Sequence, residues 1–159
     1  MDSITVEAVR TATDDLRDLI AELDQTLAQD YAPEQRHGLP LDAILQPHVR
    51  FFVARLDGNA VGCGGVALFA TFGEVKRMYV RESARGRGIA RALLSRIETE
   101  TRKGGLDVLR LETGDRQLDA TRLYERAGFI HCDAFGDYAS MTPQALATSI
   151  FFEKRLAGL

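Results

Sequence analysis

The chain has 159 residues, a mass of 17.6 kDa, 45% hydrophobic and 27% charged residues, and a formal net charge of −3. This length predicts a single domain over residues 1–159, which buries roughly 70% of its unfolded surface, and the composition excludes a disordered chain, a collagen-like repeat and a coiled coil. The longest charge-free stretch, residues 58–73, is too short and too rich in glycine to span about 30 Å of hydrocarbon, and no secretory leader is visible, so we expect a cytoplasmic protein without a membrane partner.

The first third of the sequence predicts a strand followed by two helices. Residues 4–9 alternate apolar and polar side chains, which is typical of a strand. Apolar residues then recur at helical spacing through residues 14–31. A short helix is expected around residues 41–45, because Pro40 and Pro47 disfavour its extension.

The remainder predicts strands that alternate with two helices. Asp57-Gly58-Asn59 is a turn signal between two strand-like segments, residues 51–56 and 60–69, so a hairpin is the simplest interpretation. The later elements are expected to be strands at 74–80, 106–113, 129–132 and 150–156 and helices at 88–103 and 119–127. A strand, a helix and another strand at this spacing form a right-handed crossover between parallel strands. We therefore predict a mixed α/β fold whose other strand pairs are antiparallel.

Basic residues are concentrated in one segment. Residues 76–103 hold nine basic and three acidic residues, a net of +6, whereas the rest of the chain carries −9. Within this segment, the loop before the second long helix contains Gly86 and Gly88, which permit positive φ, and consecutive N–H groups at a helix start attract an anion. Four arginines are expected to surround that anion: Arg81, Arg85, Arg87 and Arg91. The alternative is a tight turn with solvated arginines.

Two motifs carry a family resemblance. The loop fits neither the Walker pattern nor the dinucleotide fingerprint, but it resembles the Gln/Arg-x-x-Gly-x-Gly/Ala pyrophosphate loop of the GCN5-related N-acetyltransferases (GNAT), matched by Arg85, Gly88 and Ala90. Residues 117–129 are similar to the family's Asn-x-x-Ala-x-x-Leu-Tyr-x-x-x-Gly-Phe helix, with Gln117 in place of the usual Asn. The resemblance covers roughly residues 50–156. It implies the GNAT fold, a mostly antiparallel sheet with a splayed parallel strand pair and helices on both faces.

The resemblance also implies acetyl-CoA as cosubstrate, and no metal is expected because no Cys/His/Asp spacing in the sequence resembles a metal site. The cofactor would lie where the strands at 74–80 and 106–113 separate, because the unpaired backbone of Met78, Tyr79 and Val80 can pair with the two amides of pantetheine. The pyrophosphate would be held by the loop, and the second motif would complete the site. The cofactor-binding residues implied in this way, besides these three, are Arg85, Gly86, Arg87, Gly88, Ile89, Ala90, Gln117 and Ala120.

Acetyl transfer to an amine needs a neutral nucleophile and a proton for the departing thiolate. Tyr124 matches the tyrosine that protonates the thiolate in the family, although it could be an ordinary core residue. Glu74 lies where the histone-acetylating branch carries its general base. An ion pair between Glu74 and Lys76 or Arg77 is the alternative, and water could replace the base.

The acceptor side is less well specified by the sequence. Five residues fall in segments that wall the acceptor site in the family: Tyr31, His37, Glu112, Phe135 and Tyr138. Lys76 and Arg77 could bind an acceptor's carboxylate, remain solvated or attract the cofactor. We expect a small-molecule amine acceptor that attacks acetyl-CoA directly in a ternary complex.

Three other functions are consistent with parts of the pattern. A non-catalytic acyl-CoA-binding sensor would keep the loop without the chemistry, and a protein N-terminal or lysine acetyltransferase would differ only in acceptor. A nucleic-acid binder is disfavoured, because no aromatic stacking platform accompanies the arginines.

A homodimer could form through an exposed C-terminal strand.

Overall fold

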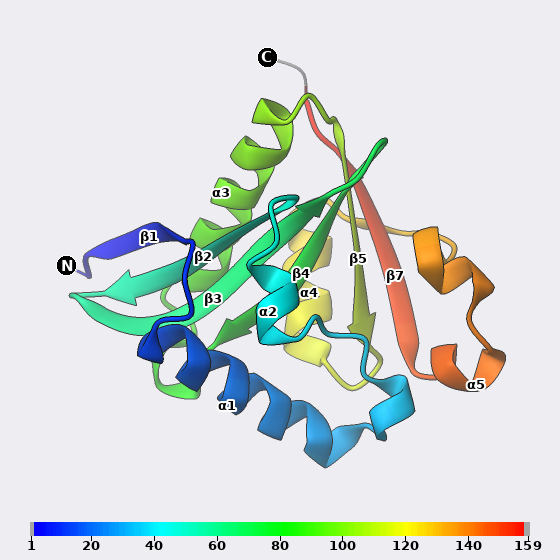
Figure 1. Ribbon diagram of the computed structural model, residues 1–159, viewed down its shortest axis with the longest axis horizontal. Helices are drawn as coiled ribbons and strands as arrows, with labels where there is room; N and C mark the ends of the chain where they lie inside the picture. Colours follow the sequence, from blue (N-terminus) through cyan, green and yellow to red (C-terminus); the bar gives the residue numbers. More distant parts are fainter. Residues whose placement is uncertain (1, 158–159) are drawn as a thin grey trace.

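The computed structural model describes residues 2–157 and contains a seven-stranded sheet with the order β1-β2-β3-β4-β5-β7-β6 (Figure 1). Only β4 and β5 run parallel; every other neighbouring pair is antiparallel. This confirms the predicted mixed sheet with one parallel pair. The strands are β1 (Ile4–Val9), β2 (Val49–Leu56), β3 (Asn59–Leu68), β4 (Gly73–Val80), β5 (Val108–Gly114), β6 (Ile130–His131) and β7 (Ser149–Arg155).

Within residues 2–157, five α-helices and three short 3-10 turns connect the strands. The long helix α1 begins at the residue after Thr13, whose side chain accepts a hydrogen bond from the N–H of Leu16. The predicted helices are confirmed to within one residue at each end, whereas α5 and the 3-10 turns were not predicted. The helices are α1 (Asp14–Asp30), α2 (Leu41–Ile44), α3 (Ile89–Lys103), α4 (Leu118–Arg126) and α5 (Pro143–Leu146), and the 3-10 turns are Pro33–Gln35, Glu82–Ala84 and Gly136–Ser140.

The helices cover both faces of the sheet, as expected. Successive residues of β2 point to opposite faces, so Phe52 packs in the cluster that contains Leu93 of α3, while Phe51 packs in the cluster that contains Leu16 of α1. All four side chains are at most 2% exposed. The sheet is therefore the centre of two hydrophobic cores. Within residues 2–157, no helix is long and apolar enough to cross a membrane.

The parallel pair separates almost as soon as it forms. β4 and β5 pair only at Gly73 with Leu109 and at Glu74 with Arg110. Beyond Glu74, the β5-facing edge of β4 has no strand partner, which confirms the predicted splayed pair.

β4 is also irregular on its other side. Its register with β3 shifts between Cys63 and Gly65, and Arg77 adopts a φ of +56°, which is uncommon for a residue with a side chain.

One expectation about the sheet edge is wrong. The C-terminal strand β7 is not an edge strand, because β6 pairs with it at Phe152 and Glu153. The surface that we expected to join two subunits is therefore partly occupied by the chain's own residues 130–131.

Candidate active site

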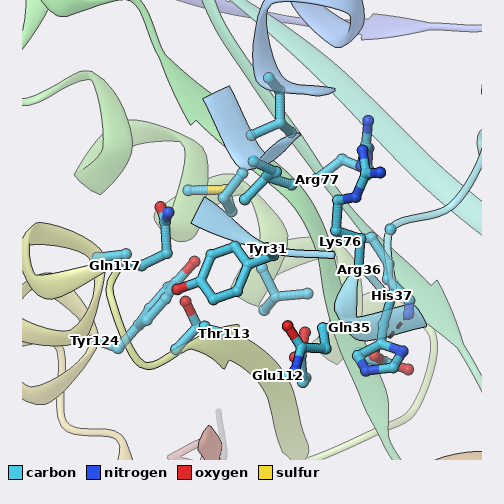
Figure 2. Close-up of a pocket in the computed structure, with 18 of the residues that line it drawn as sticks. Tyr31, Gln35, Arg36, His37, Lys76, Arg77, Glu112, Thr113, Gln117 and Tyr124 are labelled. Carbon is cyan, nitrogen blue, oxygen red and sulfur yellow. Dashed lines mark ion pairs between the residues drawn. The ribbon is translucent and has the colours of Figure 1, made fainter. Parts of the chain in front are cut away.

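A cavity lies where β4 and β5 separate, and it collects most of the residues that the sequence singled out (Figure 2). Its walls come from the end of α1, the loop at residues 35–38, β4, β5, α4 and the 3-10 turn at 136–140. The predicted site residues that line it are Tyr31, His37, Glu74, Met78, Glu112, Gln117, Ala120, Tyr124 and Tyr138. Phe135 is not among the lining residues. It packs instead in an aromatic cluster with Tyr138 and Phe151.

The loop before α3 has the geometry of an anion site. Gly86 and Gly88 have φ of +79° and +84°, and a Cβ at either position would meet nothing within 4 Å, so glycine is required there by conformation and not by space. Gly88 is the N-cap of α3 and offers no side-chain cap. Among residues 2–157, the N–H groups of residues 88–91 find no backbone acceptor. Four unpaired donors at the positive end of a 15-residue helix favour a bound anion.

The arginines around this loop are not equally available. Arg81 forms an ion pair with Glu22 of α1 at 2.7 Å and also donates to the carbonyl of Ala60. Glu22 thus already compensates the charge of Arg81, and the part of Arg81 in the anion site stays a prediction. The hydrogen bonds that the Arg81 guanidinium donates to Glu22 lower the pKa of the Glu22 carboxyl group. Arg85 donates a hydrogen bond from Nε to the carbonyl of Val80. Nη1 of Arg87 lies 3.6 Å from Oδ2 of Asp2, which makes a weak ion pair.

Tyr124 combines a packed ring with a place in the cavity wall. The ring, 5% exposed, packs against Phe129 and Phe152 at centroid distances of 5.6 and 6.3 Å. The hydroxyl makes no hydrogen bond within the described part of the chain, and Figure 2 shows the side chain entering the cavity below Gln117. Burial raises the pKa of the Tyr124 phenol, so the group keeps its proton. Both interpretations of Tyr124 thus have support in its surroundings.

Glu74 is 5% exposed and belongs to a buried network. Its Oε2 lies 2.7 Å from Nζ of Lys76 and accepts a hydrogen bond of 2.7 Å from the hydroxyl of Tyr138. Lys76 also donates to the Tyr138 hydroxyl at 3.1 Å. The structure therefore shows the ion pair that was the alternative for Glu74, with Lys76 as its partner. Arg77 pairs instead with Asp24.

Glu112 of β5 is the second carboxyl group in the cavity wall. It accepts one hydrogen bond, from the hydroxyl of Ser149 at 2.7 Å, and burial raises its pKa. His37 and Lys76 are close enough to oppose that shift. His37 is itself held in place, because its Nε2 donates to the carbonyl of Ala145 at 2.9 Å. Glu112 thus has fewer hydrogen-bond and ion-pair partners than Glu74.

One wall of the cavity has no signal in the sequence. Gln35, Arg36 and Gly38 lie in a loop without periodicity, and only the fold brings them to the cavity. Tyr31 was expected near the acceptor, and its hydroxyl accepts from the N–H of Arg116 at 2.7 Å.

A model of the Acetyltransferase (GNAT) family matches residues 13–129. The chain belongs to this family. The matched segment contains both motifs, so the resemblance seen in the sequence is confirmed. Membership in an acetyltransferase family indicates acyltransferase activity.

Individual relatives support the same assignment over nearly the whole chain. A protein of Azospirillum brasilense named IAA acetyltransferase is 42% identical over 158 residues, 98% of this chain and 100% of the relative. A solved structure from Klebsiella pneumoniae, assigned by name to the acyl-CoA N-acyltransferases, is 33% identical with a TM-score of 0.77, covering 97% of this chain and 98% of that one. A GNAT family acetyltransferase from Elizabethkingia anophelis with acetyl-CoA bound shares the fold, with a TM-score of 0.68 at 19% identity over 96% and 98% of the two chains.

The residues of this GNAT protein fit a coenzyme A ligand. The free N–H groups of residues 88–91 suit a diphosphate, and the open edge of β4 offers backbone groups to an amide-containing chain. The two features are adjacent in the chain, since β4 leads directly into the loop.

Proposed function

We propose that the protein is an acetyl-CoA-dependent N-acetyltransferase that acetylates the primary amine of a small molecule by direct attack in a ternary complex. The observation that carries the proposal is the position of Tyr124 and Glu112 in the wall of one cavity, at the open edge of β4. A proton donor and a proton acceptor are the two groups that acyl transfer to an amine requires.

The cosubstrate would be held by the residues that the family resemblance implies. The backbone of Met78, Tyr79 and Val80 lies on the open edge of β4, and the loop from Arg85 to Ala90 follows it. Gln117 and Ala120 line the cavity from α4 and its N-terminal end. In this arrangement the whole chain serves as one catalytic domain.

In the reaction, the amine nitrogen attacks the thioester carbonyl carbon, the C–N bond forms and the C–S bond breaks. Tyr124, which burial keeps protonated, gives its proton to the departing thiolate and recovers one when the nitrogen loses its second proton to form the amide. The acceptor ammonium must lose a proton before attack. The net products are the amide, the free thiol and one proton.

Two carboxyl groups line the cavity, those of the buried Glu74 and the half-buried Glu112, and both are candidates to take the ammonium proton. Glu74 remains the residue that the resemblance implies, but its Oε2 already accepts from Lys76 and Tyr138. Glu112 has Ser149 as its one hydrogen-bond donor among the described residues, and burial raises its pKa above the ordinary carboxyl value, which makes its carboxylate a stronger base than an exposed one. We therefore assign the role of proton acceptor to Glu112. Glu74 instead holds the side chains of Lys76 and Tyr138 in place.

The experiment is release of free thiol from acetyl-CoA across a panel of amines, with peptides that carry free N-termini or lysines included. Turnover of a small amine supports the proposal, and turnover of peptides alone would favour a protein acetyltransferase. Binding of coenzyme A without turnover on any acceptor would favour the sensor.

A further inference from the structure

Two buried nitrogen atoms in the cavity wall have no partner. Among residues 2–157, the buried side-chain nitrogens that lack a hydrogen bond are Nε of Arg36 and Nε of Arg77, and both residues line the cavity. A buried donor without an acceptor is costly, because it has lost its hydration without replacement. Two such donors in one wall indicate that a ligand with acceptor atoms completes the site.

The two arginines differ in how their charge is compensated. Arg77 pairs with Asp24, and Lys76, the other cation of β4 in the cavity, pairs with Glu74. Within the described residues, the guanidinium of Arg36 forms neither an ion pair nor a hydrogen bond. After these pairs are set aside, Arg36 and Glu112 are the guanidinium and the carboxyl group of the cavity wall that have no ion-pair partner among the described residues.

The loop that carries Arg36 is seated closely on β4. A Cβ at Gly38 would lie 1.9 Å from Nη1 of Arg77, so the absence of a side chain there lets the loop pack directly on that guanidinium. Arg77 reaches this position with a φ of +56°, within the irregular part of β4. Backbone strain of this kind persists only where surrounding contacts hold it. The position of Arg36 is thus fixed by tertiary contacts.

We propose that the acceptor carries a carboxylate beside its amine and that Arg36 binds this carboxylate, while the amine faces Glu112 and Tyr124. The planar guanidinium matches a carboxylate with two parallel hydrogen bonds, and the opposite charges of Arg36 and Glu112 complement the two ends of an amino acid or a related amino carboxylate. This inference rests on the proposed acetyltransferase function and names its substrate class.

The test compares matched acceptors and matched variants. Amino acids and their carboxamides present an amine with and without the neighbouring anion, and both are assayed by thiol release, at equal concentrations of the neutral amine, with wild type, Arg36→Gln and Arg36→Lys. Arg116→Gln is the control, because it removes the same charge from an exposed side chain near Tyr31 while leaving the Arg116 N–H in place. Melting temperature and coenzyme A affinity are measured for every variant.

We expect wild type to prefer at least one amino acid over its carboxamide, and Arg36→Gln to raise KM for that amino acid by about 10- to 100-fold, as loss of a charge-assisted pair implies. Its kcat, its KM for the carboxamide and its coenzyme A affinity should stay near wild-type values. Arg36→Lys keeps the positive charge but lacks the planar guanidinium, so its KM for the amino acid should lie between those of wild type and Arg36→Gln.

Three results would overturn the inference. The first is equal turnover of amino acids and carboxamides by wild type. The second is an increase in KM in Arg36→Gln that is the same for the amino acid and for its carboxamide. The third is weakened coenzyme A binding in Arg36→Gln, which would assign Arg36 to the cofactor. In each case acetyl transfer by wild type would still support the proposed function, whereas coenzyme A binding without turnover of any amine would refute that function itself.

Discussion

Replacing Gly88 with alanine isolates the contribution of the loop backbone to cofactor binding. Gly88 has a φ of +84°, and an added Cβ would meet nothing within 4 Å, so the substitution introduces conformational strain without a clash. A left-handed conformation costs an L-residue about 1–2 kcal/mol, offset by about 0.4–1 kcal/mol because alanine restricts the unfolded chain. We expect Gly88→Ala to lower the free energy of unfolding by about 1 kcal/mol.

Gly105 provides a matched control at the other end of α3. Its φ is +81° and a Cβ there would also meet nothing within 4 Å, so Gly105→Ala should cost the same stability by the same mechanism. It lies beyond the C-terminus of the helix, away from the free N–H groups. The two variants therefore separate strain from ligand contact.

Calorimetry measures the affinity of each variant for coenzyme A and for pantetheine, which lacks the diphosphate. Gly88→Ala should weaken coenzyme A about tenfold or more, because rotating one or two N–H groups away from a charged oxygen removes about 1.5–3 kcal/mol each. Pantetheine affinity should not change, and Gly105→Ala should bind both ligands like wild type. Equal coenzyme A affinities for the two variants would refute the assignment of the diphosphate to this loop.

Further substitutions test the proposed chemistry and one structural ion pair. Tyr124→Phe should lower kcat by about 10²–10⁴ with unchanged coenzyme A affinity; an unchanged kcat would remove its acid role. In wild type, kcat/KM should rise with pH through an inflection above the ordinary carboxyl range, because protonated Glu112 cannot accept a proton and burial raises its pKa; Glu112→Gln should abolish this limb, and its persistence would exclude Glu112. Glu74→Gln should instead cost about 3–5 kcal/mol in denaturant unfolding, since it leaves Lys76 buried and unpaired; wild-type stability would contradict this. Glu22, with its pKa lowered by Arg81, stabilises the fold above the ordinary carboxyl pKa, and this contribution is lost as pH falls through the lowered value, so Glu22→Gln should show less acid destabilisation than wild type in unfolding at neutral and acidic pH.

The elements that could be predicted from the sequence are those specified by local patterns. The periodicity of α1 and α3 and the turn at Asp57 and Gly58, both at positive φ, are confirmed because neighbouring residues alone determine them. The 3-10 turns and the four-residue helix α5 were missed, since such short elements show no periodicity and depend on tertiary contacts.

The charges of the site were harder to predict than its motifs. The loop glycines are specified by their own conformation, and the pair of Lys76 with Glu74 is a contact between residues two apart in β4 that the sequence already suggests. The pairing of Arg77 with Asp24, in contrast, depends on how α1 and β4 lie in the fold. Arg36 carried no sequence signal, because its loop is placed by packing on Arg77. Phe135 was predicted near the acceptor, and aromatic packing holds it behind the cavity wall.

The glycines of β3 have a packing role that no nucleotide-binding motif accounts for. Gly62, Gly64 and Gly65 fit no nucleotide fingerprint and lie within a strand, where glycine is normally unfavourable. The structure gives a reason: a Cβ at Gly64 would lie 2.3 Å from Sδ of Met78, and one at Gly62 would lie 2.8 Å from the carbonyl of Tyr79. Missing side chains in β3 thus leave room for the irregular part of β4, which in turn sets the direction of Arg77 and the edge that faces the cavity.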